Sequence, residues 1–254
     1  MAPSNLHKLS YWEEVYQGEK ENYDESNIVP EEWFEENCDK IINWVNNHFK
    51  EEEKKNVSIL DIGCGNGLFL HKLHQRGFKK LCGFDFSENA IELAKKFLSE
   101  GDNNRNISSC INNNSNHSNN HSNGYSINGS NRYNNDETHI QVLDIYNIEK
   151  EINDKSKLKK KYDLLNDKGT FDIFFMNNKP YEYFKHVSFF FQVNTLFCLT
   201  SCNACKEELL NIVKKFNETN TKFELSLYDE ICYKTITFGG ITGQIITTLI
   251  FLCS

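Results

Sequence analysis

The sequence predicts an α/β fold in which strands alternate with helices around one mostly parallel sheet. An apolar run at 57–62 leads through three alternating glycines into a helical pattern at 66–75. The same succession of strand and helix recurs along the chain. The last two apolar segments, 222–228 and 244–252, follow each other with no helical pattern between them. We therefore expect a Rossmann-like seven-stranded sheet with an antiparallel C-terminal strand and helices on both faces.

The predicted strands are short apolar runs bounded by turn residues, and the predicted helices carry their apolar residues on one face. In chain order the strands are 57–62, 79–85, 138–143, 162–166, 195–200, 222–228 and 244–252. The helices are 37–50, 66–75, 87–99 and 204–216. We expect 149–161 to form a charged linker or a short helix, and the aromatic-rich stretch 171–191 to be helical or mixed.

The N-terminal region and one internal segment depart from this alternation. Residues 1–50 are expected to form a cap and a helix ahead of the main domain, which spans 51–254, because 1–36 is rich in aromatic and acidic residues. The segment 102–136 consists almost entirely of Asn, Ser, Gly and His. Such a composition cannot bury enough apolar surface to offset the entropy of ordering. It predicts a disordered insertion in a surface loop.

Charge and cysteine content exclude several classes of function. The net charge of −8 argues against sequence-independent nucleic-acid binding, which needs a basic surface. No apolar run approaches 18 residues and the N-terminus lacks a signal-peptide pattern, so we expect a cytoplasmic protein without a membrane span, and a monomer. The nine cysteines lack the spacing of a disulfide framework, and the lone pair Cys202 and Cys205 does not predict a metal site.

The segment 61–67, Asp-Ile-Gly-Cys-Gly-Asn-Gly, carries the clearest functional signal. Glycines at the end of a strand permit positive φ angles, and the N–H groups of the following helix favour an anionic group. The spacing does not match the dinucleotide fingerprint G-x-G-x-x-G, because Leu68 stands where its third glycine is expected. A second strand ends in Asp85, an acid placed to accept hydrogen bonds from ribose hydroxyls. The remaining alternative is a glycine turn in another kind of α/β protein.

An acid two residues before the first glycine makes this segment resemble motif I of the class I S-adenosylmethionine (SAM) methyltransferases. The resemblance implies SAM as the cofactor. It implies the following cofactor-binding residues: Asp61, Gly63, Cys64, Gly65, Asn66, Gly67, Asp85, Phe86, Asp144, Ile145 and Asn166.

Further blocks narrow the resemblance to one family. They are 11–16, Trp33-Phe34, Asp-Lys-Gly-Thr-Phe-Asp at 167–172, Leu-Thr-Ser-Cys-Asn at 199–203 and Phe-Gly-Gly at 238–240. In this order they resemble the elongation factor 1-alpha lysine methyltransferase 2 group, over nearly the whole chain except the insertion. The resemblance implies a protein-lysine methyltransferase whose partner is translation elongation factor 1-alpha.

Site roles follow from this resemblance and from the chemistry of amines. Asp167 is expected to be the catalytic residue that docks and orients the substrate ammonium. The expected substrate-binding residues are Trp33, Phe34, Lys168, Thr170 and Asn203. Because a second cation disfavours an incoming ammonium, Lys168 is expected to point away or to pair with an acid.

Other interpretations remain open at this point. The run 178–181, Asn-Lys-Pro-Tyr, faintly resembles the Asn-Pro-Pro-Tyr motif of methyltransferases that act on adenine or glutamine amino groups. That reading requires 171–177 to be the fourth strand and Asp167 to be a loop residue. The chain is alternatively a SAM-dependent methyltransferase of another protein or of a small molecule, or an inactive SAM-binding scaffold.

Overall fold

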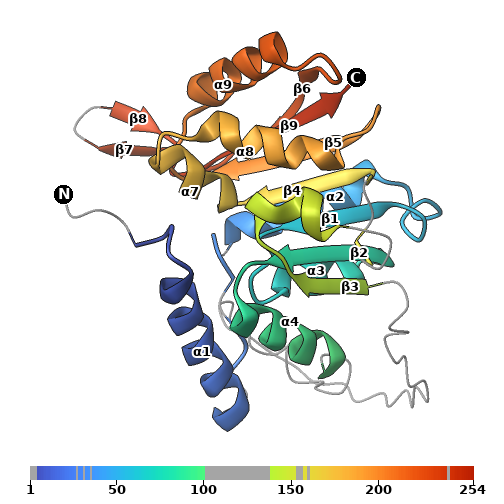
Figure 1. Ribbon diagram of the computed structural model, residues 1–254, viewed down its shortest axis with the longest axis vertical. Helices are drawn as coiled ribbons and strands as arrows, with labels where there is room; N and C mark the ends of the chain where they lie inside the picture. The colour runs from blue at the N-terminus through green and yellow to red at the C-terminus, as the bar shows by residue number, and fades with distance from the viewer. Residues whose placement is uncertain are drawn as a thin grey trace, which may run out of the picture.

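A seven-stranded sheet with the order β3-β2-β1-β4-β5-β9-β6 forms the centre of the molecule (Figure 1). The computed structural model describes residues 5–26, 28–30, 32–34, 36–100, 138–152, 157–158, 161–238 and 241–254. The predicted insertion at 102–136 lies outside the described residues. The first five strands of the chain run parallel, whereas β9 is antiparallel to both β5 and β6. The predicted fold class is therefore confirmed.

Each predicted strand appears in the sheet. The strands are β1 (Ser58–Ile62), β2 (Lys80–Asp85), β3 (Thr138–Val142), β4 (Leu164–Lys168), β5 (Leu196–Ser201), β6 (Leu225–Ile231) and β9 (Thr247–Cys253). β4 begins and ends two residues later than predicted, so that Asp167 lies within the strand. The Asn-Pro-Pro-Tyr interpretation is wrong, because its required strand is helix α7 (Thr170–Met176).

Helices cover both faces of the sheet. Beyond α7 they are α1 (Leu9–Ser26), α2 (Glu36–His48), α3 (Leu68–Gln75), α4 (Glu88–Glu100), α6 (Ile148–Glu151), α8 (Pro180–Val187) and α9 (Lys206–Thr219). Two short 3-10 turns accompany them, η1 (Ile145–Asn147) and η2 (Ser188–Phe190). Apolar residues of α2 and α3 pack with one face of the sheet, and those of α7, α8 and α9 pack with the other. None of the described helices is long and apolar enough to cross a membrane.

The N-terminal helix α1 lies against α4 (Figure 1). The carboxylate of Glu13 accepts hydrogen bonds from the first backbone N–H groups of α4, those of Glu88 at 2.6 Å and Asn89 at 3.2 Å. This contact satisfies N–H donors that a helix leaves open at its start. The ion pair between Lys20 and Glu92 joins the same two helices. Glu13 and Lys20 therefore hold α1 against α4.

A small hairpin, β7 (Ile236–Phe238) and β8 (Ile241–Gly243), forms a separate two-stranded sheet that the sequence analysis did not predict. The analysis treated 229–243 as the loop before the last strand. Its signal was present, because two short runs that contain Ile and Thr flank a Gly-Gly dipeptide. Runs of three residues are too short to show a period of two.

Candidate active site

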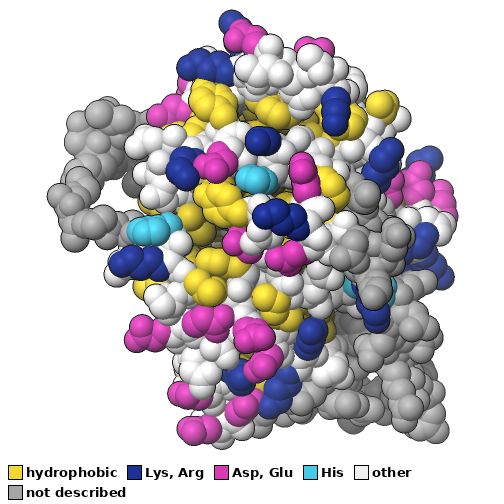
Figure 2. Space-filling model, in the orientation of Figure 1, with side chains coloured by type: hydrophobic (Ala, Val, Ile, Leu, Met, Phe, Trp, Pro, Cys, Tyr) yellow, Lys and Arg dark blue, Asp and Glu magenta, His cyan; other side chains and the backbone are white. Residues whose placement is uncertain are grey.

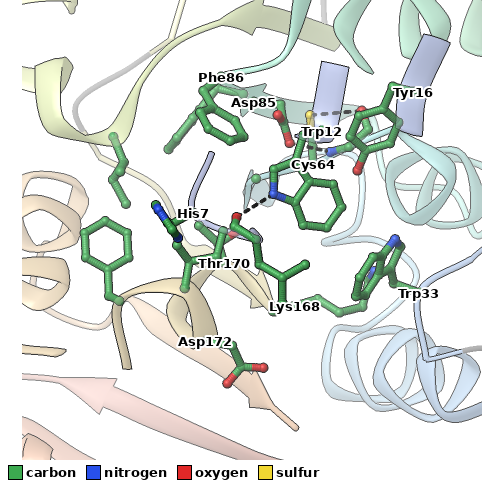
Figure 3. A pocket seen from close by; sticks show the side chains of 18 of the residues that line it. His7, Trp12, Tyr16, Trp33, Cys64, Asp85, Phe86, Lys168, Thr170 and Asp172 are labelled. Atoms are coloured by element: carbon green, nitrogen blue, oxygen red, sulfur yellow. Dashed lines mark hydrogen bonds between the residues drawn. The ribbon is translucent and has the colours of Figure 1, made fainter. Parts of the chain in front are cut away.

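A cleft opens at the carboxyl ends of β1, β2 and β4 (Figure 3). It encloses about 1160 Å³, part of it open to solvent. β1 and β4 are neighbours in the sheet, but the chain continues from β1 toward β2 and from β4 toward β5. Open α/β sheets bind their ligands at such a reversal of strand order, outside the carboxyl ends of the strands. Most of the predicted site residues line this cleft.

The glycine loop lies at the floor of the cleft in a backbone conformation that residues with a side chain rarely adopt. Gly63, Gly65 and Gly67 have φ angles of 65°, 51° and 76°, all in the left-handed region. A Cβ atom at Gly63 would collide with the hydroxyl of Thr170, and one at Gly65 with the hydroxyl of Tyr16. The first two glycines thus let two other segments of the protein close onto the loop.

Asp85 ends β2 with its carboxylate at the cleft. Oδ2 accepts a hydrogen bond from the backbone N–H of Gly65 at 3.0 Å, and Oδ1 accepts one from Ser87 at 2.9 Å. The residue is 6% exposed, and burial raises its pKa to about 6, although the backbone hydrogen bonds act in the opposite direction. A carboxylate has about four acceptor sites, so Asp85 retains acceptors for hydroxyl donors in the cleft.

Beyond Asp85 the wall of the cleft is apolar and aromatic. It is built by residues that follow β2 and β3, namely Phe86, Leu143, Ile145 and Tyr146. Asp144 also lines the cleft, and its Oδ1 accepts a hydrogen bond from the N–H of Tyr146 at 3.0 Å, which caps η1. This wall suits the flat face of a base rather than a phosphate.

The predicted cofactor residues divide into two groups. Those that line the cleft are Gly63, Cys64, Gly65, Asn66, Asp85, Phe86, Asp144 and Ile145. Asp61, Gly67 and Asn166 do not line it. Asn166 donates a hydrogen bond from Nδ2 to Oδ1 of Asp61 at 2.7 Å, and both residues are buried. Burial raises the pKa of Asp61 to about 7, against the opposing effect of the Lys168 charge. This pair joins β1 to β4 just ahead of the loop.

Residues from the N-terminus complete the cofactor side of the cleft, and the sequence analysis missed them as site residues. Leu6, His7, Trp12 and Tyr16 all line it, and Figure 3 shows Trp12 and Tyr16 beside Cys64. The indole N–H of Trp12 donates to the carbonyl of Leu6 at 2.7 Å. The Trp12 and Tyr16 rings stack with their centroids 5.9 Å apart. Their spacing of four residues, one helical turn, was the available signal.

The predicted substrate residues Trp33, Phe34, Lys168, Thr170 and Asn203 all line the cleft. The hydroxyl of Thr170 donates to the carbonyl of Ile62 at 3.0 Å, which ties α7 to β1. Lys168 pairs with Glu32, with 2.9 Å between Nζ and Oε1. The expectation that Lys168 pairs with an acid is confirmed, although Glu32 itself was not predicted as a site residue.

A second acid that the sequence analysis missed as a site residue, Asp172, holds the loop after β5. It lines the cleft and is 3% exposed. Its carboxylate accepts hydrogen bonds from the Ser201 hydroxyl, from the backbone N–H of Cys202 at 2.9 Å and from the Cys202 thiol at 3.1 Å. These contacts fix the loop that carries Asn203 at the edge of the cleft.

Asp167 does not line the cleft, contrary to the role expected for it. Its side chain is fully buried and accepts hydrogen bonds from the backbone N–H of Phe171 and from the Tyr183 hydroxyl, the latter at 2.5 Å. Burial raises the pKa of Asp167 to about 8, although these hydrogen bonds lower it. Successive residues of a strand point to opposite sides. Lys168 therefore faces the cleft, whereas Asp167 faces α7 and α8.

Comparison with known proteins places this cleft in a family. A family model described as a methyltransferase domain matches residues 53–118. The crystal structure of magnesium protoporphyrin IX methyltransferase from Synechocystis with bound SAM shares the fold, with a TM-score of 0.54 and 10% identity over 93% of this chain and 96% of that one. The N-methyltransferase NodS from Bradyrhizobium japonicum, in complex with S-adenosylhomocysteine, also has a TM-score of 0.54, at 12% identity over 95% and 97% of the two chains.

Relatives in sequence identify the family more closely than the solved structures do. EEF1A lysine methyltransferase 2 from Danio rerio is 32% identical, over 98% of this chain and 88% of its own length. The human protein of the same name is 29% identical over 98% and 87% of the two chains. Protein-lysine N-methyltransferase efm4 from Schizosaccharomyces pombe is 29% identical over 99% and 95%. Because this similarity extends along almost the entire sequence, the chain belongs to the EEF1A lysine methyltransferase 2 family.

Proposed function

We propose that this protein transfers a methyl group from SAM to a lysine of translation elongation factor 1-alpha. The proposal is supported first by relatives that carry this name over nearly their full length. It is also supported by one feature of the cleft: the glycine loop and Asp85 face an aromatic wall formed by Trp12, Trp33 and Phe34. Such a wall suits the alkyl stem of a lysine side chain.

The residues of the cleft fit SAM. The free acceptor sites of Asp85 suit the two ribose hydroxyls, and the apolar wall around Phe86 and Ile145 suits the adenine. Two glycines of the left-handed loop, Gly63 and Gly65, line the cleft with backbone alone. When bound, SAM supplies an electrophilic methyl group on a sulfonium.

The protein's own residues align the methyl donor with the amine and control the access of water. Proximity and orientation contribute several kcal/mol to displacement reactions. A lysine amine must be neutral to attack, and deprotonating a lysine of ordinary pKa at pH 7 costs about 4.6 kcal/mol. Aromatic surroundings lower this cost because burial disfavours the charged form. Trp12, Trp33 and Phe34 provide such surroundings, and solvent at the open side of the cleft takes up the proton.

Asp167 acts as a positioning residue in this proposal. By accepting hydrogen bonds from Phe171 and Tyr183 it fixes the first turn of α7 against β4 and α8. That turn carries Thr170 and Asp172, which both line the cleft. We include a cytoplasmic location and a monomeric state in the proposal.

The first test is the transfer itself. Incubation with tritiated SAM and purified elongation factor 1-alpha is expected to label that factor on lysine, as mass spectrometry of its peptides will show. The Asp85→Ala variant serves as the control and is expected to label nothing, because it lacks the ribose acceptor. A wild-type protein that labels another lysate protein or a small molecule, but not elongation factor 1-alpha, would contradict the proposed substrate.

The affinity for S-adenosylhomocysteine is expected to fall as the pH decreases through about 6. The raised pKa of Asp85 means that the free protein is protonated there below this pH, and a protonated carboxyl loses an acceptor for the ribose. One proton taken up at this pKa weakens binding about tenfold at pH 5. Calorimetry between pH 5 and pH 8 measures this dependence. The Asp85→Asn variant should bind more weakly at pH 8 and lose the Asp85 component of the pH dependence; an unchanged profile would refute the assignment.

Asp167→Asn is expected to alter the pH dependence of stability while leaving the affinity for S-adenosylhomocysteine within a few-fold. The folded-state pKa of Asp167 is raised, so its stabilising contribution is complete below pH 4 and is lost as the pH rises to about 8. The variant should therefore gain stability relative to the wild type across this range in urea unfolding. Asp163→Asn, just before the same strand, is the matched control. Loss of methyl transfer alone, with stability and cofactor binding intact, would instead restore the catalytic role.

A further inference from the structure

We propose that Glu32 binds the ammonium group of the incoming substrate lysine, with Lys168 balancing its charge. This inference rests on the proposed function, because it assigns the substrate-binding carboxylate of the same cleft. It replaces the docking role that the sequence suggested for Asp167.

The two oxygens of Glu32 have different surroundings. Oε1 lies 2.9 Å from Nζ of Lys168, and the two side chains are only 10% and 12% exposed. Oε2 is buried and has no hydrogen-bond partner. Among the described residues, the side-chain amide oxygen of Asn166 is the only other buried polar side-chain atom in this state. Buried carboxylate oxygens are nearly always paired, and leaving one unpaired is costly. Oε2 of Glu32 is thus a hydrogen-bond acceptor that remains available at the wall of the cleft.

The other carboxylates of the cleft are already engaged by the protein. Asp85 accepts backbone hydrogen bonds on both oxygens, and Asp172 is bonded on both by the loop after β5. Asp144 caps η1. Within the described lining of the cleft, Glu32 is the carboxylate that combines burial with an unpaired oxygen.

Aromatic rings beside Glu32 suit a cation with an alkyl stem. Nζ of Lys168 already lies 5.8 Å from the centroid of the Phe34 ring, within the range of a cation–π contact. The Trp33 ring is 6.3 Å from Phe34 and 5.2 Å from Trp12. Figure 3 shows Trp12, Trp33 and Lys168 on the same side of the cleft. The ammonium of Lys168 is thus held here by the Glu32 carboxylate and the face of the Phe34 ring.

The backbone at Phe34 is held in an uncommon conformation. Its φ angle is 68°, in the left-handed region that bulky residues rarely adopt. Such strain is concentrated at binding and catalytic sites, where the surrounding structure enforces it. Here it accompanies a chain segment that presents Glu32, Trp33 and Phe34 to the same cleft.

Lys168 explains how a carboxylate can bind a lysine that must later become neutral. A lone carboxylate would hold the substrate as an ammonium, because an opposite charge favours the charged form. Burial lowers the pKa of Lys168, but the Glu32 carboxylate raises it by more, so the pKa lies above its ordinary value and Lys168 remains protonated. The pair therefore offers an acceptor whose net charge is close to zero.

The test uses n-butylammonium as a mimic of the lysine side chain. It is titrated into the full-length protein saturated with S-adenosylhomocysteine, and tryptophan fluorescence reports binding near Trp12 and Trp33. The wild type should bind saturably. Glu32→Gln should weaken binding about tenfold or more, the effect of losing a charge-assisted hydrogen bond. Lys168→Gln should strengthen it, because Glu32 is then uncompensated. Glu230→Gln, in the Lys206–Glu230 pair outside the cleft, is the matched control and should bind like the wild type.

A structural role would give a different pattern. If the Glu32–Lys168 pair only holds the fold, both single variants should lose n-butylammonium and S-adenosylhomocysteine affinity together, and the inference fails. Removing one partner of a buried pair is destabilising. The double variant Glu32→Gln/Lys168→Gln keeps the shape without either charge, and it should fold and fail to bind n-butylammonium. Binding at the wild-type affinity by this double variant or by Glu32→Gln would overturn the inference.

Methylation kinetics separate this inference from the proposed function. With elongation factor 1-alpha as substrate, Glu32→Gln should raise KM about tenfold or more while the affinity for S-adenosylhomocysteine stays within about twofold. If the wild type does not methylate this factor but binds n-butylammonium through Glu32, the proposed substrate is wrong and the amine site stands. If the wild type methylates the factor and Glu32→Gln does so with unchanged KM, the amine site is wrong.

Discussion

The left-handed loop at 63–67 is the constraint on which the active site depends. Its backbone leaves no room for a Cβ at Gly63 or Gly65, because Thr170 and Tyr16 already fill those positions. One of these residues begins α7 after β4, and the other lies in α1 at the start of the chain. Three segments far apart in the sequence are thus brought into contact by the same short turn. The glycines shape the cleft chiefly because they leave room for the side chains of Thr170 and Tyr16.

Buried carboxylates form a second layer around this loop, and each does different work. Asp61 accepts a hydrogen bond from Asn166 and so joins β1 to β4, Asp85 reaches the cleft, and Asp167 binds the start of α7. Burial raises the pKa of all three acids toward neutrality. Hydrogen-bond donors of the backbone and of neighbouring side chains hold these carboxylates in place. A raised pKa in this protein is therefore found in residues that support the site as well as in residues that line the cleft.

The sequence predicted the sheet and the lining of the cleft that follows β1 and β2 because those signals are local. An acid, three glycines and a helical pattern lie within a dozen residues, and Asp85 ends the next strand. Glu32 and Asp172 could not be assigned in this way, because their roles come from contacts with Lys168 and with the loop after β5. Asp167 was misplaced for a geometric reason: β4 ends two residues later than predicted, and adjacent residues of a strand face opposite sides.

We infer that α1 forms a wall of the SAM site together with the glycine loop and the start of α7. Hydrogen–deuterium exchange, measured with and without S-adenosylhomocysteine, tests it most directly because it reports on every backbone segment at once. The structure predicts that the ligand slows exchange in three separate regions: the loop at 63–67, the residues around Trp12 and Tyr16, and the turn at 168–172. Protection confined to the loop and to Asp85, with unchanged exchange in α1, would contradict the account.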